Sequence, residues 1–406
     1  MSSIAQQNPT TSPTDNLVAK PTERLASLDA FRGATMLLMA SAGLGMAQLA
    51  AAHTDNALLR ELAFQTEHVA WRGCSLWDLI QPAFMFMVGV AVPWSTANRT
   101  ARGDSFARQF AHALLRSLLL ILLAVFLSSA YDKRTDWVFV NVLAQIGLGY
   151  PFLFLAAFTG RWGPWIAAGA ILLGYWAWFA ATPILDDVFT GLIKQAEPEP
   201  FAGFAAHWNK YVNVAAEFDR WFLNLFPRGE PHVINKGGYQ TLNFVPSLAT
   251  MLFGLLTGRL LRGPLLLDAK LLRLIAAGVV GIALGWTLDA VGVCPLVKRI
   301  WTPSWALFST GWVLLILAGF LAVIDRTGWK RSAFPLIVVG LNPITVYCLF
   351  QLMSGFIKQQ TKIHLGQEIF FSFGAAWTAF LERGAVLLVL WLIAFWMWWR
   401  KIFVRL

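Results

Sequence analysis

A histidine followed by a carboxylate carries the clearest chemical signal in this sequence. His68 precedes a long apolar stretch that contains Asp78 and Gln81. Imidazole has a pKa suited to proton transfer near neutrality, and a carboxylate can orient it and stabilise its charged form. Asp78 and Gln81 are three residues apart, so they share one helical face. The pattern predicts a catalytic His68 supported by Asp78, if the chain between them folds back; the alternative is a surface histidine.

A second polar group lies near the beginning of the chain. Asp29 and Arg32 are also three residues apart and can pair on one helical face, with Arg24 and Ser27 about one turn earlier. Ionisable groups in apolar surroundings are costly and usually face a partner or a cavity. Two interpretations stay open, namely an ion pair that orients this helix and a site that binds an anion.

Isolated polar residues interrupt other apolar stretches. Their default role is hydrogen bonding between helices. The pair Asn342-Pro343 is more specific, because proline breaks the helical ladder and frees a carbonyl. The residues predicted to contact a substrate or to donate hydrogen bonds to a developing oxyanion are Gln81, Gln145, Trp301, Ser304 and Asn342.

The elements that hold these residues must be unusually apolar. Of 406 residues, 57% are apolar and 13% are charged, whereas an ordinary soluble domain is about 25% charged. This excludes a disordered chain and a conventional soluble enzyme. The three cysteines are far apart, without CxxC spacing, so no metal site or disulfide framework is expected. The net charge of +10 forms no basic tract, so no nucleic-acid partner is expected.

The predicted fold class is all-α, a polytopic membrane bundle of about ten transmembrane helices. A spanning helix needs about 20 largely apolar residues. Ten stretches qualify, at 28–52, 75–95, 110–130, 138–159, 163–182, 244–262, 272–292, 302–324, 333–357 and 380–402.

The charges between these stretches predict an orientation. With the N-terminus in the cytoplasm, the inner segments carry 17 Lys and Arg against 5 Asp and Glu, and the outer segments 14 against 16, which follows the positive-inside rule. Both termini are therefore expected in the cytoplasm, and His68 on the outer side. Residues 1–23 are predicted to be a disordered tail and residues 24–406 a transmembrane domain. Within it, 183–243 is a long periplasmic loop, either a cap over the outer mouth or a packed structural loop.

Two motifs resemble those of the heparan-α-glucosaminide N-acetyltransferase family, including its bacterial NagX-like branch. The first, R-L-x-S-L-D-x-F-R-G, covers residues 24–33, and the second, H-x-x-W-x-G-x-x-x-x-D-L-I-x-P-x-F-M-F-M-V-G, covers 68–89. Weaker matches follow in order at 141–150, 246–258, 298–305 and 340–347.

The resemblance implies an enzyme of the bacterial inner membrane. It would move an acetyl group from cytosolic acetyl-CoA to a glucosamine-type amine at the outer side, with His68 as acetyl acceptor or general base. Arg24, Ser27, Asp29 and Arg32 would then help to bind acetyl-CoA, and no metal is expected. Relatives are often dimeric, so a homodimer is one expectation. Two other functions stay open: a transporter or flippase of a sugar or lipid-linked glycan, and a polysaccharide O-acetyltransferase.

Overall fold

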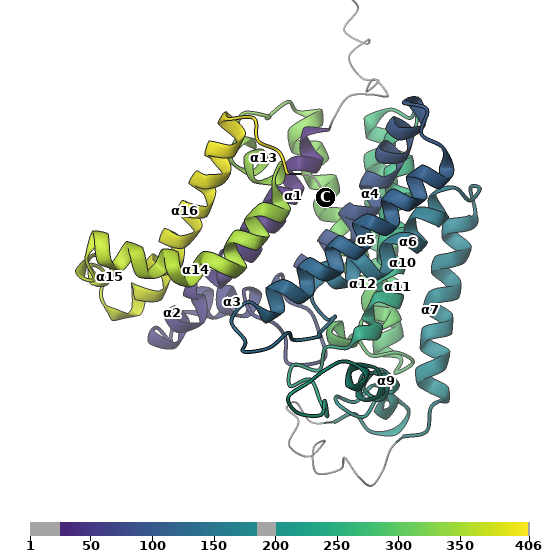
Figure 1. The fold of residues 1–406 in the computed structure, drawn as a ribbon, viewed down its shortest axis with the longest axis horizontal. Helices are drawn as coiled ribbons and strands as arrows, with labels where there is room; N and C mark the ends of the chain where they lie inside the picture. Colours follow the sequence, from purple (N-terminus) through teal and green to yellow (C-terminus); the bar gives the residue numbers. More distant parts are fainter. Residues whose placement is uncertain (1–24, 185–199, 405–406) are drawn as a thin grey trace, which may run out of the picture.

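The computed structural model describes residues 25–184 and 200–404, which form a bundle of helices (Figure 1). Within these residues there is no strand, and the isolated β-bridge joins Arg72 and Val297. The predicted all-α class is confirmed. Among the described helices, seven are long and apolar enough to cross a membrane: α4 (Ile80–Ala101, entered through the turn Trp77–Leu79), α5 (Phe106–Ser129), α7 (Gly163–Ala181), α10 (Phe244–Arg262), α11 (Leu267–Ala290), α12 (Pro303–Phe320) and α16 (Thr378–Trp399).

The other three expected spans are bent or short. Helix α1 (Ala26–Ala40) continues at an angle of 47° into Ala42–Ala52, which contains α2 (Met46–Ala52). Helix α13 (Phe334–Gly340) meets α14 (Pro343–Leu365) at 80°, and the break falls at Asn342-Pro343 because proline cannot continue the hydrogen-bond ladder. Helix α6 (Val142–Ala157) has 16 residues. Each of the ten predicted stretches therefore corresponds to one helix or one bent pair.

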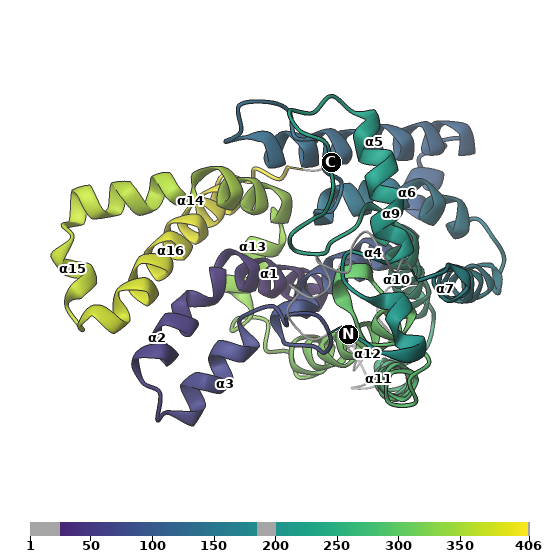
Figure 2. The ribbon, with the colours of Figure 1, turned by 90° about the horizontal axis from the view of Figure 1, so that it is seen from below.

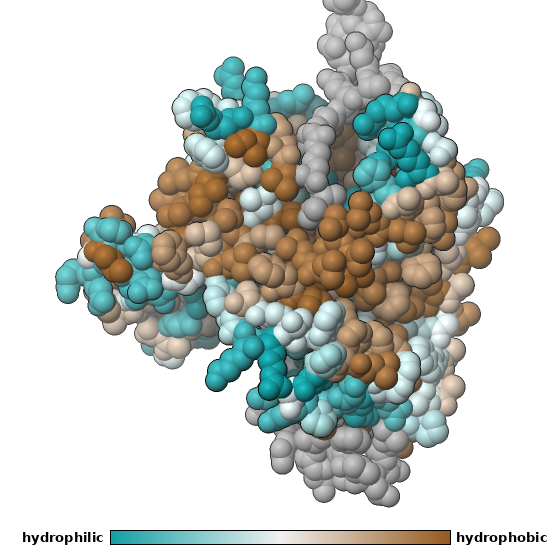
Figure 3. All heavy atoms as spheres, in the orientation of Figure 1, coloured by the Kyte–Doolittle hydropathy of each residue, from teal (hydrophilic) through white to brown (hydrophobic). Residues whose placement is uncertain are grey.

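The surface carries a broad apolar band between two more polar ends (Figure 3). Large apolar side chains point outward from helices that pack only one face inside, for example Leu173 on α7 and Leu272 on α11, which are 66% and 68% exposed. Soluble monomers rarely expose contiguous apolar areas of this kind. The band is the surface expected of a polytopic membrane protein.

Helices α4 and α10 pack closely along their length. A Cβ atom on Gly89 would lie 1.9 Å from the carbonyl oxygen of Met251, and one on Gly254 would lie 2.0 Å from that of Phe86. Only glycine allows this approach, which is the small-residue packing that holds membrane helices together. The contact fixes the position of α4, whose two ends carry the candidate site and a basic cavity.

Residues 200–243 pack against the end of the bundle where α4 begins (Figure 1). They form a 3₁₀ turn at Gly203–Trp208 and the short helix α9 (Val214–Phe222). Trp208 is fully buried, and its carbonyl accepts a hydrogen bond of 3.1 Å from the indole of Trp71. This segment therefore supports the loop that carries His68. Helices α2, α3 (Ala57–Gln65), α14, α15 (Glu368–Phe371) and α16 extend to one side of the bundle (Figure 2).

Candidate active site

Two loops that are distant in sequence meet at the beginning of α4. The β-bridge between Arg72 and Val297 joins them, Gly73 N donates to the carbonyl of Leu296 at 3.0 Å, and the Arg72 guanidinium binds the carboxylate of Asp289 at 2.9 Å. Because of this pairing, the turn Lys298–Ile300 lies beside the loop that carries His68.

His68, Asp78 and Lys298 form a compact cluster at this junction. Asp78 Oδ1 lies 2.7 Å from His68 Nδ1 and 3.1 Å from Lys298 Nζ, and Lys298 Nζ lies 3.1 Å from His68 Nδ1. The backbone N–H groups of Val69 and Ser75 both donate to Asp78 Oδ2 at 3.2 Å. The Asp78 and Lys298 side chains are 1% and 4% exposed, whereas His68 is 39% exposed. The imidazole is therefore the member of the cluster that a substrate can reach.

The contacts select one tautomer of His68. Nδ1 cannot donate to Asp78 and accept from Lys298 at the same time. An ionised carboxylate only accepts, and its contact with Nδ1 is the shorter one, so we assign the proton to Nδ1 and the Lys298 ammonium to the same carboxylate oxygen. Nε2 then keeps its lone pair. The ring is flanked edge-on by Trp77 and Tyr239, with centroids 6.4 and 6.5 Å away.

The surroundings act on the protonation of His68 in opposite directions. Burial lowers the pKa of the imidazole, the hydrogen bond to Asp78 raises that pKa, and the positive charge of Lys298 lowers it, so that the net shift is a lowering from the ordinary value. Burial also lowers the pKa of Lys298, which Asp78 opposes. The lowered pKa favours the neutral imidazole, whose lone pair a nucleophile or a general base requires.

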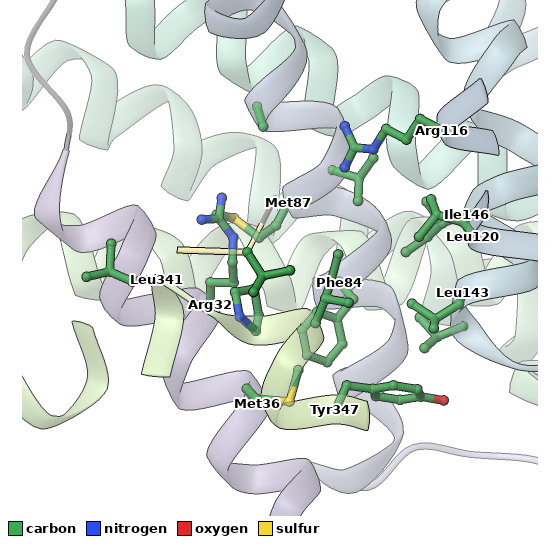
Figure 4. A pocket seen from close by; sticks show the side chains of 16 residues that line it. Arg32, Met36, Phe84, Met87, Arg116, Leu120, Leu143, Ile146, Leu341 and Tyr347 are labelled. Atoms are coloured by element: carbon green, nitrogen blue, oxygen red, sulfur yellow. The ribbon is translucent and has the colours of Figure 1, made fainter. Parts of the chain in front are cut away.

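An intramembrane cavity of about 310 Å³ lies further along α4 (Figure 4). Its walls are mostly apolar, with Met36 and Tyr347 at one end and the guanidinium groups of Arg32 and Arg116 at the other. The helices that line it are α1, α4, α5, α6 and α14. An apolar space with a few convergent charged groups is typical of a ligand pocket.

A second cavity of about 380 Å³ adjoins the first at the far end of α4. Arg116 lines both cavities, and Arg99 and Arg102 line only the second, with His112. The Arg116 guanidinium donates to the hydroxyl of Tyr150 at 3.1 Å and lies 4.5 Å from the centroid of that ring. Its Nε is buried and has no hydrogen-bond partner among the described residues. This basic vestibule, lined by Arg99, Arg102, His112 and Arg116, suits a ligand that carries several negative charges.

The cluster and the cavities are placed along the same helix. Asp78 precedes α4 and Arg99 lies in its last turn, a separation on the order of 30 Å. The described residues that line the apolar cavity do not include His68. By helical spacing, Gln81 shares one face of α4 with Phe84 and Val88, which line the cavity. A route from cavity to histidine would therefore follow this face.

The residues predicted to bind acetyl-CoA are not all at the cavity. Arg24 lies outside the described residues. Ser27 is fully buried beside Asp325, and Asp29 is buried and pairs with Arg32 at 3.2 Å. Of the described members of this group, Arg32 lines the cavity. Asp29 and Arg32 therefore form the predicted ion pair. Arg32 also lines the cavity, as the alternative of an anion-binding site requires.

Four of the five residues predicted to contact a substrate or an oxyanion make hydrogen bonds to other parts of the protein. The amide nitrogen of Gln145 donates to the carbonyls of Phe139 and Thr241 at 2.7 and 3.1 Å. The Trp301 indole donates to Thr250 at 3.3 Å, and the Ser304 hydroxyl donates to the carbonyl of Pro295 at 2.7 Å.

Asn342 is occupied in the same way. Its amide nitrogen donates to the carbonyl of Ile402 at 2.9 Å, and its oxygen accepts from the backbone of Val404 at 2.9 Å. These hydrogen bonds give Gln145, Trp301, Ser304 and Asn342 structural roles, and their predicted role as donors to an oxyanion stays a prediction.

Two residues of this arrangement were not among the predicted site residues. Lys298 is 220 residues from Asp78, although the motif at 298–305 places a lysine and an arginine at the edge of an apolar stretch. Arg116 stands within an apolar stretch and was assigned to the inner charges that set orientation. Its half-buried position at two cavities depends on how several helices pack together, which the local sequence does not show.

Similarity to known proteins covers most of the chain. The human heparan-alpha-glucosaminide N-acetyltransferase is 23% identical over 397 residues, which is 85% of this chain and 55% of the human protein. The chain is similar to heparan-alpha-glucosaminide N-acetyltransferases. The mouse protein of the same name is 22% identical over 391 residues, 84% of this chain and 55% of its own length. This confirms the resemblance indicated by the two motifs, while the assignment to a NagX-like branch stays a prediction. The chain spans about half the length of these curated relatives, and no protein-family model matches it.

Proposed function

We propose that this protein is a membrane acetyltransferase that takes acetyl from acetyl-CoA and delivers it to a glucosamine-type amine. The observation that carries the proposal is the arrangement along α4. A neutral, oriented histidine lies at one end of the helix and a basic vestibule at the other. The names of the similar proteins support the same reaction class.

The basic vestibule is the proposed entrance for the donor. The phosphates of acetyl-CoA would contact Arg99, Arg102 and Arg116, since guanidinium groups bind phosphate through paired, charge-assisted hydrogen bonds. The unpartnered Nε of Arg116 supports this assignment. The apolar cavity beyond it would hold the pantetheine arm, with Arg32 in its wall. Ser27 and Asp29 then support the helix that carries Arg32, and a role of Arg24 in binding acetyl-CoA stays a prediction.

The chemistry at His68 can follow two balanced routes. In the covalent route, Nε2 attacks the thioester carbonyl, the C–S bond breaks and CoA leaves as a thiolate that takes up a proton. The acetyl-imidazolium, stabilised by Asp78, then passes its acetyl group to the amine, which loses a proton. In the direct route, Nε2 removes that proton while the amine attacks the thioester carbonyl, the C–S bond breaks, and the CoA thiolate takes up the proton from Nε2. Both routes need the lone pair of Nε2.

The charge distribution supports the orientation of this reaction. Helix α1 begins and α16 ends at the same side of the bundle (Figure 1), and the basic vestibule lies towards this side. The excess of Lys and Arg there supports a cytoplasmic position for this side. The proposed location is therefore the inner membrane, with the donor inside and the sugar amine outside. We retain a homodimer as an expectation for solution measurements.

Arg116→Gln should raise the KM for acetyl-CoA about 10- to 100-fold, because one lost hydrogen bond to a charged group costs about 1.5–3 kcal/mol. Purified protein is incubated with labelled acetyl-CoA and glucosamine, and N-acetylated product is counted. Acetyl-pantetheine, which lacks the nucleotide phosphates, should show little change in KM.

The matched control is Arg273→Gln, an exposed arginine that lines neither cavity. It should leave the KM near wild type. An equal rise in KM for acetyl-CoA and for acetyl-pantetheine in Arg116→Gln would contradict the assignment of Arg116 to the phosphates. Absence of acetyl transfer by the wild-type protein would make a sugar transporter the leading alternative.

A further inference from the structure

We propose that Lys298 is a positioning residue that keeps the imidazole of His68 neutral by sharing the carboxylate of Asp78. The inference rests on the proposed role of His68. A carboxylate alone would both orient the imidazole and favour its protonation, which would occupy the lone pair that the reaction needs. A buried cation on the same carboxylate opposes protonation of the imidazole and leaves the orientation of the ring unchanged.

The geometry places the ammonium group where it can do this. Lys298 Nζ lies 3.1 Å both from Asp78 Oδ1 and from His68 Nδ1, so its charge acts on the imidazole at contact distance. The Lys298 side chain is 4% exposed, and water screens a charge at such a position only weakly. The same charge on a surface lysine would have little effect on His68.

The backbone around Lys298 holds the ammonium group in place. The turn Lys298–Ile300 ends at Trp301, whose φ of 48° lies in the left-handed region that a bulky residue rarely adopts. Trp301 is fully buried, and its indole donates to Thr250 on α10. The surrounding structure thus maintains a costly conformation, which is common where the position of a side chain serves function.

The other charged and titratable groups around His68 do not replace Lys298. Arg299 also lowers the pKa of His68 through its charge, but less than Lys298 does, and its guanidinium donates to the carbonyls of Gly237 and Val69. Burial raises the pKa of Tyr239 to about 12 and that of the Cys74 thiol to about 12, so both are uncharged near neutrality. Glu67 precedes His68 on the same loop and is exposed. Lys298 is therefore the buried cation at contact distance.

The position of Lys298 predicts how the reaction rate depends on pH. The pKa of His68 is lowered mainly by burial, with Lys298 adding to the lowering and Asp78 opposing it. Activity that needs the neutral imidazole is present above the pKa of folded His68 and is lost as the pH falls through it. Removal of the Lys298 charge raises that pKa. The acid limb of the rate profile then moves to higher pH, and the rate recovers in alkaline buffer.

The test compares Lys298→Gln with Lys298→Arg over pH 5 to 9. Glutamine can still donate a hydrogen bond to Asp78 but has no charge, so its acid limb should lie at higher pH than that of the wild type. Arginine keeps the charge and should keep the limb near the wild-type position. Lys236→Gln removes an exposed lysine of the outer cap and should leave the profile unchanged.

A second readout does not depend on acetyl transfer. Diethyl pyrocarbonate reacts with histidine only in its neutral form, and mass spectrometry of the modification at His68 as a function of pH gives the titration of this residue. We expect the midpoint to rise in Lys298→Gln and to stay in Lys298→Arg. An unchanged midpoint in Lys298→Gln, or loss of folded protein for both Lys298 variants, would overturn the inference. A shifted midpoint in a protein without acetyl transfer would instead overturn the proposed function.

Discussion

His68→Ala should lower the rate of acetyl transfer to glucosamine about a thousandfold, and more if the acetyl group passes through His68 covalently. General acid–base catalysis by one positioned side chain contributes about 10²- to 10⁴-fold. Burial and Lys298 favour a neutral His68 ring, and Asp78 occupies Nδ1 so that Nε2 is free. Because the side chain is 39% exposed, its removal should cost little stability.

The measurement is steady-state transfer of labelled acetyl by detergent-purified protein. His364→Ala is the control, since that histidine is exposed on α14, away from the cavities and from the cluster. It should retain the wild-type rate. A folded His68→Ala protein that transfers acetyl at the wild-type rate would show that the reaction occurs elsewhere in the molecule.

Asp78→Asn is expected to lower kcat about 10²- to 10⁴-fold with a small change in the KM for acetyl-CoA. An amide keeps the size of the side chain but can present its NH₂ group to Nδ1, which favours the tautomer with the proton on Nε2. Loss of the correct tautomer in a histidine–carboxylate pair is known to cost about 10⁴ in kcat. The donor site is unaffected, because the vestibule lies at the other end of α4.

Asp78→Asn should also destabilise the protein. Lys298 would be left as a buried charge without its carboxylate, and breaking a buried pair in this way costs about 3–5 kcal/mol. The double variant Asp78→Asn, Lys298→Gln should recover part of the thermal stability without recovering the rate. Asp268→Asn, which removes an exposed partner of Arg326, serves as the control. An Asp78→Asn protein with normal kcat would contradict the role of Asp78 in orienting His68.

The fold could be predicted closely from the sequence because the membrane imposes a simple constraint. A helix that crosses it must be long and apolar, and ten such stretches correspond to the observed helices. The bend at Asn342-Pro343 was predictable from the chemistry of proline. The 80° angle was not, since it depends on packing of α13 against α1, where Gly33 and Gly340 allow close contact.

The candidate site was predictable only where its residues are close in sequence. His68 and Asp78 are ten residues apart, and their types alone suggested a pair. Lys298 joins them through the loop pairing around Arg72 and Val297, which no local pattern encodes. The contacts of Asn342 with the backbone of Ile402 and Val404 were unpredictable for the same reason, because they join residues about 60 positions apart.

The central claim is that acetyl passes from a donor at the Arg116 side to an acceptor at the His68 side. Sealed vesicles with the protein in one orientation test it directly. Labelled acetyl-CoA is supplied only at the face of the basic vestibule, and glucosamine only at the opposite face. The account predicts N-acetylated glucosamine at the His68 face, CoA release at the vestibule face, and no product when the substrates are exchanged. Product that forms only when both substrates share one face would contradict the account.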